Sequence, residues 1–301
     1  MQRLGGGLLG AVYLAEESAT GRKVAVKMLA KELRCDDETL KQCRWDARFA
    51  SASHPASIVR VYEVDRTDEG QIFIAMDYLE GESLADILHR EGRLELGRAL
   101  RLASQMAHGL SAALNAGVVH REIKPRNVMV VGADECVKLT DFGIARLRRI
   151  ATGGALSRPV GVAHEYAAPE QLVGGDAADR TDIYALGAVL YAMLAGADAS
   201  TAVGAAAGSL WQRLPVRALR PDVPAALEHL LVRALEREPE RRPSSMREVA
   251  ERLLELTATI IEKETAAGPL LAAHEHALEP SATLPRAVTG VACEPAGEPR
   301  S

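Results

Sequence analysis

Along the first 83 residues of the chain, short apolar runs with a two-residue period alternate with turn residues. This pattern predicts strands and one helix; the strands cover 22–29, 58–64 and 71–76, and the helix covers 38–52. A turn at 68–70, Asp-Glu-Gly, joins the last two strands into a hairpin. The first 76 residues therefore predict a small, mostly β layer that carries one helix.

After residue 83 the apolar positions repeat at helical spacing. The amphipathic helices expected from this period cover 84–91, 96–115, 225–235 and 245–256. Gly92 and Gly117 end the first two of them, because glycine commonly closes a helix. A second hairpin is expected from 127–131 and 137–139. Residues 182–196 are apolar on every side, which predicts a helix buried all round.

Three segments lack a clear period. Residues 144–164 are rich in Gly, Arg, Ser and Thr and predict a long mobile loop, and loops of this length inside a compact domain are usually functional. Residues 197–208 are small and predict irregular structure. From residue 257 the composition shifts, and five prolines between 269 and 301 predict a disordered tail.

The composition is that of a globular protein without a strong charge bias. At 301 residues and 48% hydrophobic, the chain can form one large bilobal domain or two ordinary ones. Its 36 Lys and Arg against 41 Asp and Glu give a net charge of −5, which excludes a global basic field for nucleic acid or an anionic membrane. Partners must therefore be inferred from individual sites.

Membrane insertion and secretion are not expected. The longest uncharged run, 183–197, is shorter than the roughly 18 to 20 residues that a membrane-spanning helix needs. The residues after Met1 lack the basic start and apolar core of a signal peptide. The four cysteines are widely and irregularly spaced, which indicates reduced thiols in a cytoplasmic protein.

The stretch from His120 to Asn127 carries the densest chemistry in the chain. Glu122, Lys124 and Asn127 supply a carboxylate, an ammonium and an amide, and Asp141 follows with a second carboxylate. Carboxylate and amide oxygens bind Mg²⁺, and lysines neutralise phosphates. This set can therefore hold a metal triphosphate beside a nucleophile.

Two further patterns, near the N-terminus, fit the same chemistry. Gly5, Gly7, Gly10 and Val12 have the spacing G-x-G-x-x-G-x-V, which lets backbone N–H groups approach phosphate oxygens; a plain glycine hairpin is the alternative. A strand follows these glycines instead of a helix, which argues against a dinucleotide-binding fold. Lys27 ends a Val-Ala-Val-Lys strand, where a solvated strand end is the alternative.

These patterns occur in the order found in the protein kinase family. The chain resembles that family, and most closely its bacterial eukaryotic-type Ser/Thr members, from about residue 3 to residue 256. The motifs that carry the resemblance are G-x-G-x-x-G-x-V at 5–12, Val-Ala-Val-Lys at 24–27, the stretch 120–127, Asp-Phe-Gly at 141–143, Ala-Pro-Glu at 168–170, Asp-Ile-Tyr-x-Leu-Gly at 182–187 and Arg-Pro at 242–243. The resemblance implies an α+β, bilobal protein kinase fold, with a small, mostly β N-lobe and a larger, mostly α C-lobe.

The resemblance also implies a role for each site residue. Lys27 holds the α and β phosphates of ATP, and Lys124 stabilises the γ-phosphate. Asp141 and Asn127 bind Mg²⁺ or Mn²⁺, and Glu122 occupies the position of the catalytic acid residue. The implied nucleotide site, with glycines over the phosphates and apolar side chains and the hinge around adenine, comprises Leu4, Gly5, Gly7, Gly10, Val12, Ala25, Met76, Asp77 and Leu79.

Further residues are implied as regulatory or structural. In this family the Arg before the catalytic acid pairs with a phosphorylated residue of the activation loop, so Arg121 is matched with Thr152 and Ser157 as candidates. An Arg121 bonded to backbone carbonyls is the alternative. Glu170 and Arg242 match the family's buried structural ion pair.

The chain departs from the family pattern at its active site. Glu122 stands where the family has Asp, and the extra methylene is expected to move its carboxylate by about 1.5 Å. Asp46 stands where the family has the Glu that pairs with Lys27, and Ala163 replaces a Thr that hydrogen-bonds the catalytic acid. The domain also begins almost on its glycines, so its first strand is truncated.

The expected organisation is a kinase domain at 1–256, divided into an N-lobe at 1–76, a hinge at 77–80 and a C-lobe at 81–256, with a disordered tail at 257–301.

The expected function is ATP-dependent phosphorylation of Ser or Thr hydroxyls in protein substrates or signalling partners, slowed by Glu122. The main alternative is a nucleotide-binding pseudokinase that acts as a scaffold or allosteric partner, because Glu122, Asp46 and Ala163 depart together. A small-molecule phosphotransferase fits less well, since the long loop and the motif at 168–170 serve protein docking. Neither nucleic-acid binding nor membrane insertion is expected.

Overall fold

The computed structural model describes residues 2–7, 10–33, 35–54, 56–145, 147, 165–173, 179–196 and 214–276, with side chains as far as 262 in the last segment. Thr152, Ser157, Ala163 and the segment 197–208 lie outside the described residues, as does 277–301. The chain divides into two units, Met1–Ile260 and Ile261–Ser301. The first unit contains both lobes described below.

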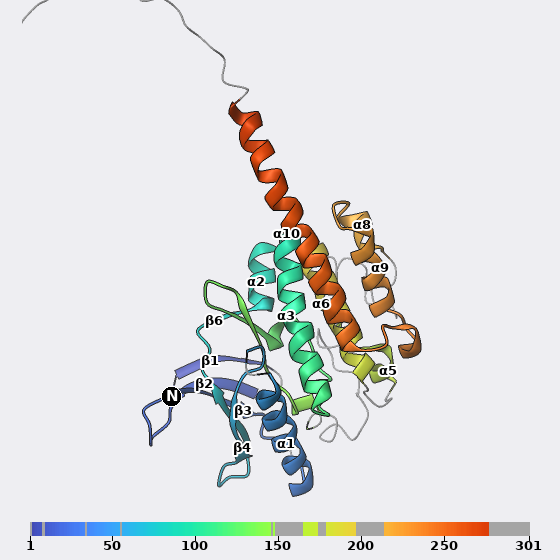
Figure 1. Ribbon diagram of the computed structural model, residues 1–301. Helices are drawn as coiled ribbons and strands as arrows, with labels where there is room; N and C mark the ends of the chain where they lie inside the picture. The colour runs from blue at the N-terminus through green and yellow to red at the C-terminus, as the bar shows by residue number, and fades with distance from the viewer. Residues whose placement is uncertain are drawn as a thin grey trace, which may run out of the picture. The chain divides into compact units, whose positions relative to one another are not determined.

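The small lobe is built on a five-stranded antiparallel sheet with the strand order β1-β2-β3-β5-β4 (Figure 1). The strands are β1 (Gln2–Gly7), β2 (Gly10–Glu16), β3 (Lys23–Leu29), β4 (Val61–Arg66) and β5 (Ile72–Asp77). Along β5, buried and partly exposed residues alternate with the two-residue period that the sequence predicts. β1 extends through Gly7 and β2 begins at Gly10, so Gly5, Gly7 and Gly10 of the glycine motif lie on two paired strands.

Gly10 occupies a position in that hairpin where no other residue fits. Its φ is +136°, and a Cβ there would lie 2.0 Å from the carbonyl oxygen of Met28. Gly10 pairs with Leu29 across β2 and β3, and two residues further along the same ladder Val12 pairs with Lys27. A side chain at Gly10 would therefore disturb the register that places Val12 beside Lys27.

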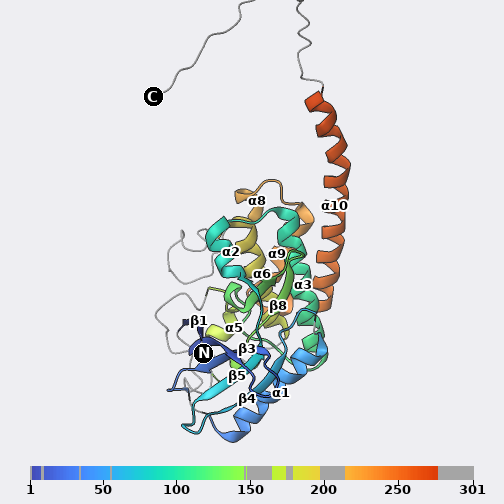
Figure 2. The same ribbon diagram turned by 90° about the vertical axis from the view of Figure 1, so that its left-hand side faces the viewer.

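One helix, α1 (Asp37–Ser53), packs against β4 of this sheet (Figures 1 and 2). It begins after Asp36, whose side chain accepts a hydrogen bond from the backbone N–H of Thr39 at 2.7 Å. Its buried face and the sheet share a small apolar cluster. The buried members of the cluster are Leu29, Leu40, Cys43, Ala47, Val64, Ile72, Ile74, Ile144 and Leu147.

The larger lobe opens with two helices, α2 (Leu84–Glu91) and α3 (Leu96–Asn115), whose bounds are those predicted from the sequence. Gly92 and Gly117 follow them with φ values of 74° and 78°, a backbone conformation that favours glycine.

A small three-stranded sheet comes next, with the order β6-β7-β8. β7 (Val128–Val131) and β8 (Cys136–Leu139) form the expected hairpin, and β6 (Gly81–Ser83), which the sequence analysis missed, pairs with β7. The short 3-10 helix η1 (Pro125–Asn127) leads into β7. This arrangement fixes the C-terminal end of the chemically dense stretch identified in the sequence.

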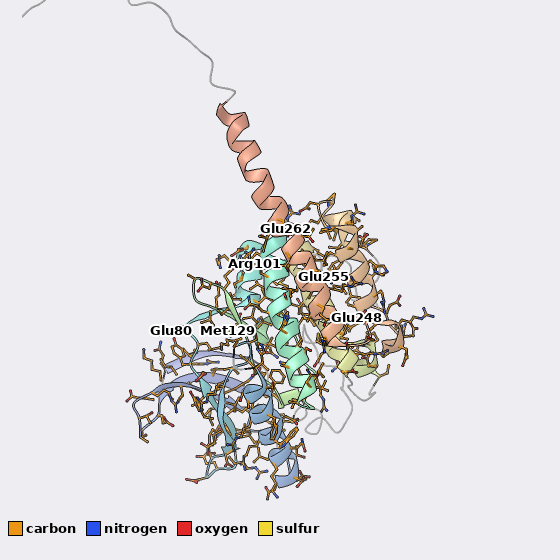
Figure 3. All side chains as sticks on the ribbon, in the orientation of Figure 1. Glu80, Arg101, Met129, Glu248, Glu255 and Glu262 are labelled. Carbon is orange, nitrogen blue, oxygen red and sulfur yellow. The ribbon has the colours of Figure 1, made fainter. Side chains whose placement is uncertain are left out.

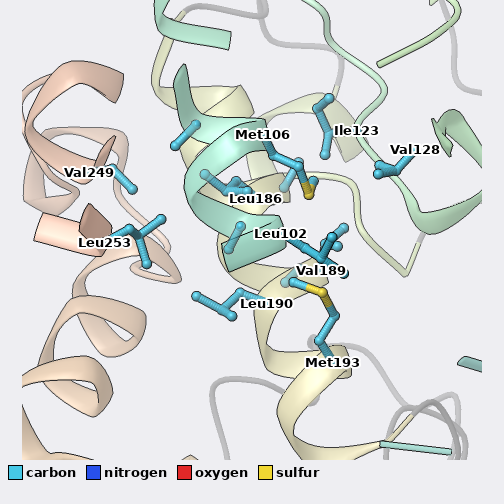
Figure 4. Packing of buried hydrophobic residues seen from close by; sticks show 14 of the residues in the cluster. Leu102, Met106, Ile123, Val128, Leu186, Val189, Leu190, Met193, Val249 and Leu253 are labelled. Carbon is cyan, nitrogen blue, oxygen red and sulfur yellow. The ribbon is translucent and has the colours of Figure 1, made fainter. Parts of the chain in front are cut away.

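The centre of the larger lobe is α6 (Asp179–Ala195), buried from Thr181 to Leu194. The prediction of a helix buried all round is therefore confirmed. α6 packs against α3, and Figure 4 shows the side chains between them. They include Leu186, Val189, Leu190 and Met193 of α6 with Leu102 and Met106 of α3.

The remaining described helices of the larger lobe follow in chain order. They are α5 (Pro169–Leu172), α8 (Val216–Leu219), α9 (Ala225–Ala234), the 3-10 helix η3 (Pro239–Arg241) and α10 (Met246–His276). A β-rich lobe and a helical lobe together confirm the expected α+β, two-lobe fold class.

α10 continues to His276. The sequence analysis expected this helix to end at Leu256 and a disordered tail to follow. The cause is a buried stripe that crosses the expected boundary. Leu253, Thr257 and Ile260 recur at helical spacing and are all buried. The Thr257 hydroxyl also donates to the carbonyl oxygen of Leu253 at 2.7 Å, so its polar group is satisfied within the helix.

Two composition-based expectations can be compared with the described residues. Cys35, Cys43 and Cys136 form no disulfide bond with one another in this part of the chain. None of its helices combines the length and the apolar character that crossing a membrane would require.

Candidate active site

The residues of the chemically dense stretch and the Asp-Phe-Gly turn are joined through Thr140. Its backbone N–H and its hydroxyl both donate to the carbonyl oxygen of Asn127, at 3.0 and 3.3 Å. Its own carbonyl accepts a hydrogen bond from His120 Nε2 at 2.9 Å. Asp141, the next residue, is thereby held against the 120–127 loop at two points.

Lys27 on β3 forms an ion pair with Asp141, with 2.5 Å between Nζ and Oδ2. Both side chains are only 12% exposed, so the pair is shielded from solvent screening. Asp141 has a φ of 72°, an uncommon backbone conformation for a residue other than glycine. The structure thus brings together a lysine and a carboxylate that lie far apart in the sequence.

Asp46 has a different neighbourhood from the one expected of it. Among the described residues Lys27 pairs with Asp141, whereas Asp46 is buried and accepts a hydrogen bond from Gln42 Nε2 at 2.9 Å. The Asp-Phe-Gly turn, which brings Asp141 to Lys27, comes close to α1 here. A Cβ built on Gly143 would lie 3.5 Å from the Cβ of Asp46, which shows how near the turn comes to α1.

Glu122 is buried and lies within hydrogen-bond distance of Lys124. Oε1 of Glu122 accepts from Nζ of Lys124 at 2.6 Å, and the side chains are 6% and 19% exposed. Asn127, itself buried, donates its Nδ2 to the backbone carbonyl of Glu122 at 2.9 Å. Glu122, Lys124 and Asn127 are therefore tied to one another within the loop.

The backbone just before Glu122 is held by Asp182 on α6. Its two carboxylate oxygens accept from the backbone N–H groups of His120 and Arg121, each at 2.7 Å. Burial raises the pKa of Asp182, and these hydrogen bonds oppose that shift. Arg121 has a φ of 69°, so these hydrogen bonds maintain a strained backbone conformation directly before Glu122.

Gln171 holds the other side of the same peptide. Its Nε2 donates to the carbonyl oxygen of Arg121 at 2.8 Å, and its Oε1 accepts from the backbone N–H of Ala168 at 3.0 Å. The amide of Glu122, at the far end of that peptide, lies 3.3 Å from the acceptor Nδ1 of His120. The Arg121–Glu122 peptide is consequently fixed at both ends.

His120 acts as a packing and hydrogen-bonding residue. It is buried, and its ring lies on that of Phe142 with 4.3 Å between centroids. Phe142 is buried as well. The contact seats the Asp-Phe-Gly turn on the loop and leaves the imidazole no exposed edge for carrying protons.

Most of the apolar residues expected around adenine lie together. Ala25 and Met76 are opposite each other on β3 and β5, and both are buried in one cluster with Val12 and Leu79 packed against it. Leu4 on β1 is 43% exposed and is absent from that cluster.

Asp77, which the sequence analysis placed in the hinge, is held by hydrogen bonds to its side chain and its backbone. The Tyr62 hydroxyl donates to Asp77 Oδ1, and the backbone N–H of Asp77 donates to the carbonyl oxygen of Arg60 at 2.9 Å. Arg22 in turn donates to the Tyr62 oxygen at 3.0 Å and lies over its ring at 4.1 Å. Burial and the bond to Asp77 raise the pKa of Tyr62, which keeps the hydroxyl protonated as a donor.

Glu170 and Arg242 form a bidentate ion pair away from this site. The two guanidinium nitrogens Nη1 and Nη2 lie 2.7 Å from the two carboxylate oxygens. Arg242 is 1% exposed and also donates to three backbone carbonyls. Burial alone would raise the pKa of Glu170, but the hydrogen bonds from Arg242 leave it below its ordinary value.

Sequence reasoning gave no role to two residues that position the loop. Asp182 belongs to the family motif at 182–187, but the motif did not predict its hydrogen bonds to the backbone of the loop. No sequence pattern pointed to Gln171, because its partner Arg121 lies far away in the chain and comes close only in the folded protein.

The chain matches the protein kinase domain family over residues 1–254. It is 36% identical over 256 residues to a probable serine/threonine-protein kinase of Clostridium acetobutylicum, covering 84% of this chain and 38% of that protein. It is 33% identical over 274 residues to the serine/threonine-protein kinase PrkC of Bacillus subtilis, covering 87% and 42%. The chain therefore spans less than half the length of these curated relatives.

Solved structures agree with this match. The crystal structure of the PknI kinase domain of Mycobacterium tuberculosis is similar with a TM-score of 0.69 at 30% sequence identity, over 86% of this chain and 94% of that one. The family match covers both lobes and every motif of the site, and we conclude that the chain belongs to the protein kinase family.

Proposed function

We propose that this chain is an ATP-dependent Ser/Thr protein kinase whose chemistry is slowed by Glu122. The observation that carries the proposal is the connection made by Thr140, which ties the loop of Glu122 and Asn127 to the turn that bears Asp141. Lys27 lies 2.5 Å from that Asp141. This connection supports a site in which a base, a metal-binding pair and two phosphate-binding lysines would act together.

The donor atoms present suit Mg²⁺ or Mn²⁺. Asp141 offers carboxylate oxygens, and Asn127 uses Nδ2 to bond Glu122, which leaves its amide oxygen as a metal ligand. Among the residues described, no group of three His, Cys, Asp or Glu side chains could hold a metal alone. ATP would complete the metal shell with its phosphate oxygens and would supply the γ-phosphoryl group.

Two lysines would hold the phosphates, and each already faces a carboxylate. Lys27 is paired with Asp141, and Lys124 is paired with Glu122. When nucleotide binds, an ATP phosphate would take the place of the carboxylate beside each lysine. The buried ammonium groups would therefore keep a negatively charged partner before and after binding.

Glu122 would take the proton of the substrate hydroxyl as the hydroxyl oxygen bonds to the γ-phosphorus. The bond from the γ-phosphorus to the bridging oxygen breaks, and ADP leaves with its electrons. A misplacement of about 1 Å can cost on the order of a hundredfold in rate. The base does limited work in a loose transition state, so we expect reduced activity with Glu122 rather than none.

A nucleotide-binding pseudokinase is the second candidate, and the two lysine–carboxylate pairs favour it. They satisfy the charges of Lys27, Asp141, Glu122 and Lys124 within the protein itself. Such a protein would bind nucleotide and act as a scaffold or allosteric partner. Its protein partners and its cytoplasmic location stay predictions under either proposal.

A phosphotransfer assay separates the two. Purified protein is mixed with labelled ATP, Mg²⁺ or Mn²⁺ and a generic protein acceptor, and Glu122→Asp and Asp141→Ala are run beside it. The kinase proposal expects transfer that rises in Glu122→Asp and vanishes in Asp141→Ala. If neither the natural protein nor Glu122→Asp transfers label, while nucleotide still stabilises the protein against thermal unfolding, the pseudokinase proposal is supported and the kinase proposal is rejected.

A further inference from the structure

The face of α1 that points away from the sheet carries an exposed aromatic pair. Trp45 and Phe49 lie one helical turn apart and stack, with ring centroids 4.2 Å apart and planes inclined by 24°. They are 39% and 48% exposed, whereas large aromatic side chains in folded proteins are mostly buried. The opposite face, with Cys43 and Ala47, supplies the apolar core contacts of this helix.

The aromatic pair lines a shallow surface pocket together with three cationic side chains. The residues that line this pocket, here called the α1 outer face, are Lys41, Arg44, Trp45, Arg48, Phe49 and Ala52. Arg44 is engaged with Asp65 at 2.9 Å. Lys41 and Arg48 form no ion pair with any other residue in the described part of the chain.

None of the residues that line the α1 outer face is acidic. Of the acidic residues of α1, Asp37 pairs with Arg66, Asp46 is buried beside Gln42, and Glu38 is exposed near the start of the helix but does not line this face. The chain as a whole has a net charge of −5. The α1 outer face is therefore a cationic, aromatic surface on an acidic protein.

We propose that the α1 outer face docks an acidic protein segment that carries an aromatic or large apolar side chain. Such a side chain would extend the Trp45–Phe49 stack, and flanking carboxylates would pair with Lys41 and Arg48. Burial of the two rings would supply the affinity, while the charges would select an acidic partner over a neutral one.

A lipid surface fits the α1 outer face less well. Recognition of anionic lipid takes clusters of about four to eight Lys or Arg, whereas the cations that line this face are Lys41, Arg44 and Arg48, and Arg44 is already paired with Asp65. The net charge of −5 would also repel an anionic bilayer.

A second copy of this chain also fits less well. In a symmetric dimer the same face is used by both subunits. Lys41 and Arg48 would then lie close to their own counterparts, and like charges across an interface oppose association.

The test uses the full chain and does not depend on phosphoryl transfer. A fluorescently labelled peptide of glutamates interrupted by two phenylalanines is titrated with the protein, and its anisotropy gives Kd. The variants are Trp45→Ala and the charge reversals Lys41→Glu and Arg48→Glu. Matched controls are Leu254→Ala, which removes a side chain that is 54% exposed on α10, and Arg101→Glu on α3 (Figure 3).

We expect each of the three variants to raise Kd about tenfold, and both controls to leave it unchanged. Binding should also weaken as salt is raised. Thermal melting of every variant checks its fold, and the charge reversals keep the aromatic pair intact.

Four results would overturn the proposal. The first two are no binding of the peptide and binding that is equal in all variants. The third is preferential binding to phosphatidylserine vesicles over the peptide. The fourth is a concentration-dependent dimer that Trp45→Ala abolishes, since a second copy would then occupy the face.

Discussion

Glu122 and Lys124 form an ion pair within one loop, with 2.6 Å between Oε1 and Nζ. The carboxylate proposed as the base and the ammonium proposed to hold the γ-phosphate are thus partners in this structure. Shortening the side chain of Glu122 is therefore expected to alter this contact.

Glu122→Asp is expected to raise kcat by about tenfold to a hundredfold, because the carboxylate returns to the reach for which this loop geometry is suited. Glu122→Gln keeps the length but removes the proton acceptor, so its kcat should fall below that of the natural protein. Steady-state phosphotransfer with one protein acceptor measures both. The control is Glu69→Asp, the same substitution at a side chain that is 78% exposed. Equal kcat in all four proteins would show that Glu122 plays no part in the rate.

Asp141→Ala should remove the metal-dependent part of nucleotide binding. A ligand at about a hundred times its Kd stabilises a folded protein by roughly 2.7 kcal/mol, and thermal shift with a non-hydrolysable ATP analogue, with and without Mg²⁺, detects this. We expect the Mg²⁺-dependent part of the shift to disappear in Asp141→Ala and to persist in Asp222→Ala, a side chain that is 61% exposed. A Mg²⁺-dependent shift that survives in Asp141→Ala would assign the metal to other ligands.

Gln171 has two hydrogen bonds that substitutions can separate. Gln171→Glu keeps an acceptor for the N–H of Ala168 but sets a carboxylate against the carbonyl oxygen of Arg121, whereas Gln171→Met loses both bonds. If the bond to Arg121 positions Glu122, kcat should fall about tenfold in Gln171→Glu with KM for ATP nearly unchanged. If kcat in Gln171→Glu equals that of the natural protein, Gln171 does not position Glu122 and only caps the start of α5 through Ala168. Hydrogen exchange of the Glu122 amide reports the same loosening without any need for turnover.

The Glu170–Arg242 pair should make stability depend on acid pH. The folded-state pKa of Glu170 lies below its ordinary value of 4.5, so protonation favours the unfolded chain. The stabilisation is present above about pH 4.5 and is lost as the pH falls through the folded-state pKa. Glu170→Gln should cost about 3 kcal/mol at neutral pH, since it leaves the guanidinium of Arg242 buried without its counter-ion.

Urea unfolding at several pH values measures this effect. The control is Glu251→Gln, which removes one partner of an exposed pair with Arg247 and should change stability by less than about 1 kcal/mol. If Glu170→Gln loses stability on acidification as steeply as the natural protein, other carboxylates carry the acid sensitivity.

Elements with strong local signals were predicted well. α2 and α3 have the expected bounds because an apolar stripe and a terminal glycine, Gly92 or Gly117, mark each of them. The buried centre at α6 followed from its lack of any polar face. These features depend on near neighbours in the chain, which a single sequence contains.

Features that depend on distant neighbours were predicted less well. The partner of Lys27 was expected to be Asp46, but the approach of the Asp-Phe-Gly turn places Asp141 within 2.5 Å of it instead. Gln171 was missed because its bond to Arg121 exists only after folding. The motifs identified which residues share a site, whereas the pairing of charges inside it needed the three-dimensional structure.

The course of α10 decides where a shortened version of this protein can end. Truncation after Leu256, the boundary suggested by composition, would cut inside the helix and remove buried Thr257 together with Ile260, a member of the large apolar core. Ile260 is 7% exposed, and deleting a buried side chain of this size costs about 2 to 5 kcal/mol. A recombinant kinase domain that retains Ile260 should therefore be easier to produce and crystallise than one trimmed to the edge of the family match at residue 254.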